Sequence, residues 1–288
     1  MSFLAALLAL ILDQGLRHLE PLRGPRWLHA YAEAFEPFAR NNDPVRATAG
    51  ALFIVLVPAV VALFLGDVLT HIWAGLGFAF AVVLFLFCLG PKDLHDEADL
   101  YIDAVQAGDE KRAVVLAAGL LQEPAAADPT ERTEAVTRAV LREANERQFA
   151  VLFWFALLGP AGALLYRSAD ALRRDPGTNA SAEFRTAATR MHGVLAWLPA
   201  HLTAVGYALA GSFEDAVSDL RGYYSTCDLH FFQVSNDVLM CTGLGALRAA
   251  VGQEAGVARL RSALGLVRRT LFIWLVIYAL ITLFGWSW

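Results

Sequence analysis

The residues of this chain that could bind an anion follow an apolar stretch near its middle. Arg167 comes directly after residues 159–166, where two glycines and a proline permit close backbone approach and free backbone amides. A guanidinium there could clamp a phosphate or a carboxylate, and Asp170 lies three residues further on. The alternative is a kinked helix in which small residues at positions 159 and 163 serve packing alone.

Further polar groups stand against other apolar stretches and could line the same pocket. Residues 142–147 form either a binding element or a charged helix end in which Glu143 pairs with Arg147. His201 is either a hydrogen-bonded core histidine or a base. Asp228 and His230 after Cys227 are too few for a zinc site, so no metal is expected. The candidate binding residues are Asn145, Tyr166, Arg167, Asp170, His201, Ser235 and Asn236.

The distribution of charge predicts the class of protein that must position these residues. Hydrophobic residues make up 57% of the 288 residues and charged ones 18%. No Lys or Arg occurs in residues 47–91, 148–166, 191–220 or 270–288. Since a basic side chain at the bilayer centre costs about 2.5–3.5 kcal/mol, we expect an all-α, polytopic integral membrane protein. The net charge of −5 argues against a nucleic-acid partner.

Residues 1–91 are expected to form an N-terminal interfacial helix, retained in the mature protein, and a transmembrane hairpin. The hairpin would use residues 47–66 and 72–90, with a connection at residues 67–71. Five arginines precede it, which places the N-terminus in the cytoplasm. Residues 92–147 then predict a cytoplasmic helical region, with a break at Gly108, a loop at residues 122–128 and a third helix from Pro129.

Residues 148–220 are expected to be broken apolar helices that form the pocket region. Several arginines lie between the two apolar stretches, so two simple crossings would put a basic loop outside. With Gly159-Pro160 and Pro199 as break points, we favour re-entrant or cytoplasm-facing helices packed on the hairpin. Two true crossings are the alternative. Residues 221–288 predict a cytoplasmic loop and helix, then a final transmembrane helix over residues 270–288.

The runs at residues 143–167 and 194–211 resemble the AmpE family of bacterial inner-membrane proteins, and the likeness extends over nearly the whole chain. That resemblance implies a multi-pass inner-membrane protein that senses or signals in the β-lactam response and β-lactamase induction. The pocket would then face the cytoplasm and bind an anionic small molecule such as phosphate, a nucleotide or a cobamide precursor. The lipid bilayer is the expected partner, and a homo-oligomer is left open.

AmpE proteins are in turn similar to the CobD/CbiB family of cobalamin biosynthesis. This implies an alternative function, a divergent adenosylcobinamide-phosphate synthase that joins an aminopropanol unit to cobyric acid with ATP and Mg²⁺. Glu143 and Asp170 would then help to place Mg²⁺; otherwise the cofactor is unknown. His201 stands where that family has Arg, and Arg147 where it has Asp. The positions that match the family's motifs are Glu143, Tyr166, Pro199, Thr203, Ser235 and Asn236.

Overall fold

The computed structural model describes residues 2–15, 43–89, 93–177, 179–227, 234–251 and 256–284, and all regular elements in these ranges are helices. Four helical segments are long and apolar enough to cross a membrane: α4 (Pro44–Ile72), the run Pro129–Arg174, α10 (Ala182–Ala210) and α13 (Val257–Leu283). The expected all-α, multi-pass membrane fold is therefore confirmed. Asp228, His230 and the tryptophans at positions 286 and 288 lie outside the described residues.

The chain divides into two compact units, and each combines segments distant in sequence. The first comprises the described residues within Met1–Pro91, Glu146–Leu198 and Tyr278–Trp288; the second comprises those within Lys92–Asn145 and Pro199–Ile277. The division of the chain into four consecutive regions stays a prediction about its linear order.

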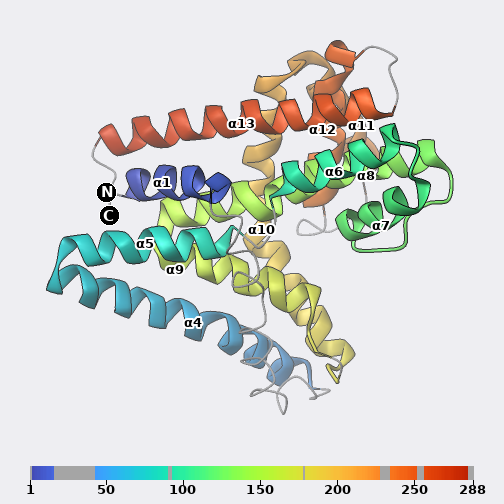
Figure 1. Ribbon diagram of the computed structural model, residues 1–288. Helices are drawn as coiled ribbons and strands as arrows, with labels where there is room; N and C mark the ends of the chain where they lie inside the picture. Colours follow the sequence, from blue (N-terminus) through green and yellow to red (C-terminus); the bar gives the residue numbers. More distant parts are fainter. Residues whose placement is uncertain are drawn as a thin grey trace. The chain divides into compact units, whose positions relative to one another are not determined.

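Helices α4, α5 (Ala74–Cys88) and α9 (Ala150–Arg174) pack against one another in the first unit, and α1 (Ser2–Gly15) packs on α5 and α9 (Figure 1). The predicted connection at residues 67–71 is wrong, since α4 continues to Ile72 and only Trp73 separates it from α5. The polar residues of that turn hydrogen-bond to their own helix instead. Thr70 Oγ1 donates to the carbonyl of Gly66 at 2.7 Å.

Helix α9 is sharply bent at Gly159, where the sequence predicts a break. Gly159 has φ 70° and ψ −157°, a conformation open in practice only to glycine, and Pro160 follows it. The two arms of α9 meet beyond the bend. A Cβ atom on Gly162 would lie 2.2 Å from the carbonyl oxygen of Trp154, whereas eight residues of straight helix would separate the two by about 12 Å.

Helix α10, by contrast, runs unbroken through Pro199, so the expected break there is wrong. Proline has no N–H, and the carbonyl of Leu195, one turn earlier, loses its helical donor. The indole Nε1 of Trp154 replaces that donor and hydrogen-bonds to the Leu195 oxygen at 3.0 Å. A neighbouring helix that satisfies the freed carbonyl is the usual way in which a proline is tolerated at membrane depth.

The start of α4 lies at the same end of the first unit as the connection between α9 and α10. Four residues from the first turns of α4 share one buried apolar cluster with the last turns of α9 and the first turns of α10. Its buried members are Ala47, Ala51, Ile54, Val55, Ala169, Leu172, Phe184, Ala187 and Ala188. The described residues between α9 and α10 are therefore at the end of the unit where α4 begins.

The second unit contains α6 (Leu94–Gln106), α7 (Glu110–Leu121), α8 (Pro129–Ala144), α11 (Phe213–Thr226), α12 (Ser235–Val251) and most of α13. The break at Gly108 and the helix start at Pro129 are confirmed. Asp93, Asp109 and Asp128 cap α6, α7 and α8, each accepting a backbone N–H. Helix α13 begins at Val257, thirteen residues before the predicted start, so that boundary is wrong.

Candidate functional site

The first unit buries a carboxylate between three arginines of its own helix. Asp170 is 0% exposed in the second arm of α9. Its Oδ2 accepts from Arg167 Nη1 at 3.1 Å, and its Oδ1 accepts from Arg173 Nη2 at 2.9 Å and Arg174 Nε at 2.8 Å. Positions −3, +3 and +4 from Asp170 lie on one helical face, so the sequence places all three guanidinium groups beside it.

Glu146, also buried, provides a second carboxylate from a different element. It belongs to a short π-helix, η2 (Asn145–Phe149), between α8 and α9. Its Oε2 accepts from Arg173 Nη2 at 2.9 Å and also from Arg174 Nη2. Widened turns of this kind occur frequently at functional sites, because they re-aim side chains that a regular helix would place elsewhere.

We call Glu146, Arg167, Asp170, Arg173 and Arg174 the acid–arginine cluster. Three guanidinium groups face two carboxylates, so the cluster carries one positive charge in excess. The arginine side chains are 16–25% exposed, whereas the side chains of the two acids are buried. An arrangement with partly exposed, excess cationic donors suits an anionic group such as a carboxylate or a phosphate.

A bare divalent cation fits the acid–arginine cluster poorly, because arginines already occupy both of its carboxylates. Across the described ranges, no three His, Cys, Asp or Glu side chains gather at a spacing that would hold a metal. Glu143, the other residue suggested for Mg²⁺, belongs to the second unit and lies 3.4 Å from Arg142. A pairing of Glu143 with Asp170 around a metal stays a prediction of the enzymatic alternative.

Tyr166 and His192 extend the acid–arginine cluster towards α10. The Tyr166 hydroxyl lies 3.3 Å from His192 Nε2, which in turn lies 3.7 Å from Asp170 Oδ1. Three of the seven predicted residues, Tyr166, Arg167 and Asp170, are thus brought together. The sequence reasoning missed Glu146, Arg173, Arg174 and His192 as members. The spacing of basic residues on both sides of Asp170 was a local signal for two of them.

The other four predicted residues lie in the second unit. Asn145 Oδ1 accepts from Thr203 Oγ1 at 3.0 Å, and both side chains are buried. His201 Nε2 lies 3.0 Å from the hydroxyl of Tyr224. Ser235 is buried at the first turn of α12, and its Oγ finds no hydrogen-bond partner within the described part of the chain. Asn236, beside it, is half-buried. A single pocket of all seven residues stays a prediction.

Comparison with known proteins adds a family to this geometry. A family model described as CobD/Cbib protein matches residues 4–283. A protein of Chromobacterium violaceum named "Cobalamin biosynthesis protein CobD" is 29% identical over 267 residues, which cover 86% of this chain and 80% of that protein. A protein of the same name from Stutzerimonas stutzeri is 31% identical over 200 residues, which cover 68% and 65%. No solved structure matches.

These matches correct the function that the AmpE resemblance implied. The family model and the curated relatives agree on the CobD/CbiB family, and the names of the relatives include cobalamin biosynthesis. A regulator of β-lactamase induction is therefore the wrong conclusion, and the alternative stated beside it has the better support. The aligned part covers less than two thirds of two of these relatives: 65% of the Stutzerimonas protein and 61% of a third relative, from Pelobacter propionicus.

Proposed function

This chain belongs to the CobD/CbiB protein family, and we propose that it acts in cobalamin biosynthesis. The observation that carries the proposal is the match of the family model from residue 4 to residue 283. It includes every described helix in full, except for the first two residues of α1. The names of the curated relatives support the same process.

Within that process we propose the amide-forming step that the family resemblance implies. A carboxylate of a corrinoid acid would be joined to the amine of an aminopropanol unit at the expense of ATP. Both the carboxylate and the phosphates of ATP are anionic. The acid–arginine cluster would bind one of these groups through Arg167. Of the two buried acids, Arg167 contacts only Asp170.

Magnesium would supply charge neutralisation of the ATP phosphates in this reaction. Because arginines occupy the acids of the cluster, the ion would enter bound to phosphate oxygens rather than to a preformed cage of carboxylates. The arginines of the acid–arginine cluster would then bind either the phosphates of the nucleotide or the corrinoid carboxylate. Asn145, His201, Ser235 and Asn236 belong to the second unit and stay separate candidate binding residues.

We further propose that the protein resides in the bacterial inner membrane, with this site open to the cytoplasm. Four apolar helical segments support the membrane assignment, and soluble ATP would reach a cytoplasmic opening. The anionic substrates and the lipid bilayer are the proposed partners; nucleic acid is not, and association into a homo-oligomer stays a prediction.

Complementation tests the proposed function directly. The full chain, produced in a bacterium that lacks its own synthase of this family, is expected to restore growth that depends on newly made cobalamin. Arg167→Ala should reduce that growth, whereas Arg221→Ala, the same exchange at an exposed position of α11, should not. If the chain accumulates in the membrane and a known synthase rescues growth while this chain does not, the proposal fails.

A further inference from the structure

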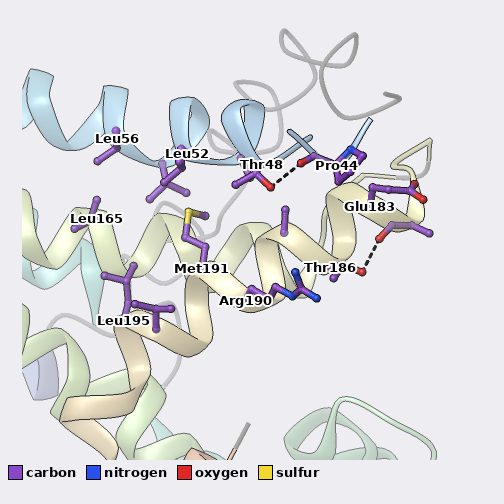
Figure 2. A pocket seen from close by; sticks show the side chains of 15 residues that line it. Pro44, Thr48, Leu52, Leu56, Leu165, Glu183, Thr186, Arg190, Met191 and Leu195 are labelled. Atoms are coloured by element: carbon purple, nitrogen blue, oxygen red, sulfur yellow. Dashed lines mark hydrogen bonds between the residues drawn. The ribbon is translucent and has the colours of Figure 1, made fainter. Parts of the chain in front are cut away.

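The first unit contains an apolar cleft that is separate from the acid–arginine cluster. It has a volume of about 620 Å³ and lies between the first turns of α4, one residue of α9 and the first turns of α10. Volumes of 300–1,000 Å³ are typical of sites for small molecules. Figure 2 shows Leu52, Leu56, Leu165 and Leu195 at one end of the cleft, so a hydrocarbon chain would find apolar walls there.

The opposite end of the cleft is polar. Figure 2 shows Thr48, Glu183, Thr186 and Arg190 there. The two threonine hydroxyls donate to carbonyls of their own helices, those of Pro44 and Ala182, at 2.7 and 2.9 Å. Arg190 and Glu183 remain as the charged groups of the cleft, and neither forms an ion pair with any residue that the structure describes.

From the length and composition of α10, we expect Arg190 at the depth of lipid phosphates. It directly precedes residues 191–210 of α10, which contain no Asp, Glu, Lys or Arg and span about 30 Å, the thickness of the hydrocarbon core. Helix α4 gives the same depth independently, because Thr48 lies in the first turns of its 20-residue apolar stretch, residues 47–66. The polar end of the cleft is therefore expected at the membrane interface on both helices.

The walls of the cleft include exposed apolar side chains. Leu52 and Val194, one from each helix, are 43% and 51% exposed, although both are apolar. In a membrane this exposed apolar surface would face hydrocarbon. The most abundant molecules that could fill the cleft there are lipids, through their acyl chains. Glu183 stands seven residues before Arg190, on the same face and about 10 Å away along the axis, and the Arg190 side chain points towards that end (Figure 2).

From this arrangement we propose that the cleft binds one phosphatidylethanolamine molecule of the surrounding membrane. One acyl chain lies along α4 and α10, the phosphate accepts hydrogen bonds from Arg190, and the ammonium group pairs with Glu183. A lipid with an anionic headgroup and no amine satisfies Arg190 but leaves Glu183 facing like charge. The phosphatidylethanolamine headgroup carries both charges and so matches both Arg190 and Glu183. This lipid site is independent of the proposed reaction.

Retention of lipid by the purified protein tests this assignment. The full-length protein is stripped of lipid in detergent and mixed with equal amounts of dioleoyl phosphatidylethanolamine and dioleoyl phosphatidylglycerol, and bound lipid is counted by native mass spectrometry. We expect one phosphatidylethanolamine per chain, in preference to phosphatidylglycerol. Arg190→Gln should lower its retention about tenfold, the effect of losing one hydrogen bond to a charged group. Glu183→Gln should abolish the preference between the two lipids.

Matched variants separate the cleft from general effects. Arg185→Gln makes the same change in charge on the same helix, but Arg185 donates to the carbonyls of Ala180 and Gly177 and should retain lipid normally. Val194→Trp fills the cleft and should prevent binding. Val205→Trp changes an equally exposed valine of α10 outside the cleft (54% against 51%) and should not.

A photoreactive phosphatidylethanolamine with a diazirine in its acyl chain gives a second measurement that needs no variant. Its crosslinks to the wild-type protein are expected on residues 44–56 and 182–195. Crosslinks confined to other segments overturn the proposal, as does equal retention of the two lipids by the wild type. Unchanged retention in Arg190→Gln overturns it as well.

Discussion

Asp170 can remain buried and charged because its own helix surrounds it with donors. A buried carboxylate without partners costs several kcal/mol, and removing one partner of a buried pair typically costs about 3–5 kcal/mol. Arg173 and Arg174 also contact Glu146, so they hold two parts of the first unit together. Arg167 contacts only Asp170 of the two acids, and its loss leaves the remaining bonds of the cluster in place.

Arg167→Ala is therefore expected to affect binding more than folding. The affinity of the full-length protein for ATP, measured by titration calorimetry in detergent, should fall by more than about 1.5 kcal/mol, the lower range for a hydrogen bond to a charged group. The melting temperature should change little. Arg221→Ala is the control. Unchanged affinity for ATP in Arg167→Ala would show that Arg167 does not bind the nucleotide, and unchanged affinity for the corrinoid acid as well would remove it from the site.

His95 gives the second unit a pH-dependent contribution to stability. Its Nδ1 lies 3.5 Å from Asp93, and this carboxylate, with Asp99 as a further contributor, raises the pKa of His95 above its usual value. A raised pKa in the folded state means that the stabilisation is fully present below about pH 6.5, the unfolded value, and is lost as pH rises through the folded value. We expect wild type to exceed His95→Gln in melting temperature most clearly at pH 5.5–6.

A pH series of melting temperatures from 5.5 to 8.5 checks this expectation. The difference between wild type and His95→Gln should shrink steadily as the pH increases above neutrality. A constant difference, or one that grows with pH, would mean that the imidazolium form of His95 does not pair with Asp93 in the folded protein.

Local signals in the sequence located some elements well and others poorly. Gly108 and the segment before Pro129 were found because glycine, proline and capping aspartates act on their immediate neighbours. The start of α13 was missed because Arg259 and Arg261 suggest a polar loop, although Leu260 and Leu264 between and beyond them are buried on one face. A transmembrane pattern records only the apolar part of a helix that continues into polar surroundings.

The contacts between distant segments could not be read from the sequence in the same way. Glu146 reaches Arg173 across 27 residues, and the bend at Gly159 lies between them. Pro199 predicted a broken helix because the local rule counts the missing N–H, whereas Trp154, 41 residues from Leu195, supplies a replacement donor. In both cases the sequence-based prediction failed because the interaction partner comes from a segment that only the packed structure brings into contact.

The hydrogen bond from Trp154 predicts a coupling between two substitutions. Trp154→Phe should lower the free energy of unfolding by about 1 kcal/mol beyond its loss of packing, because the carbonyl of Leu195 is left without a donor. In a Pro199→Ala background the restored N–H can serve that carbonyl, so the same exchange should cost less. Denaturant unfolding of the four proteins of this double-mutant cycle measures the difference; strictly additive effects would contradict the explanation.

The ends of the helices in the first unit constrain how the chain threads the membrane. The beginning of α4 and the connection between α9 and α10 share one apolar cluster and thus one end of the unit. Five arginines in the first 46 residues favour a cytoplasmic start for α4. The connection should therefore also be cytoplasmic, which agrees with the topology preferred from the sequence and disfavours a basic external loop.

Labelling of single cysteines tests this topology. After Cys88, Cys227 and Cys241 are replaced by serine, Asn179→Cys should react with a membrane-impermeant maleimide only in opened cells or inverted vesicles. Trp73→Cys, at the exposed turn between α4 and α5, should react from the outside of intact cells. Reaction of Asn179→Cys in intact cells would reverse the assignment of the connection.

The apolar cluster at the start of α4 also has a consequence for the synthesis and membrane insertion of the protein. Ala51, Ile54 and Val55 leave the ribosome more than a hundred residues before Leu172 and Phe184, which cover them in the finished fold. At ordinary rates of translation that interval is on the order of ten seconds. During this time the face of α4 must be shielded by lipid or by the insertion machinery, so defects in that machinery should affect this helix first.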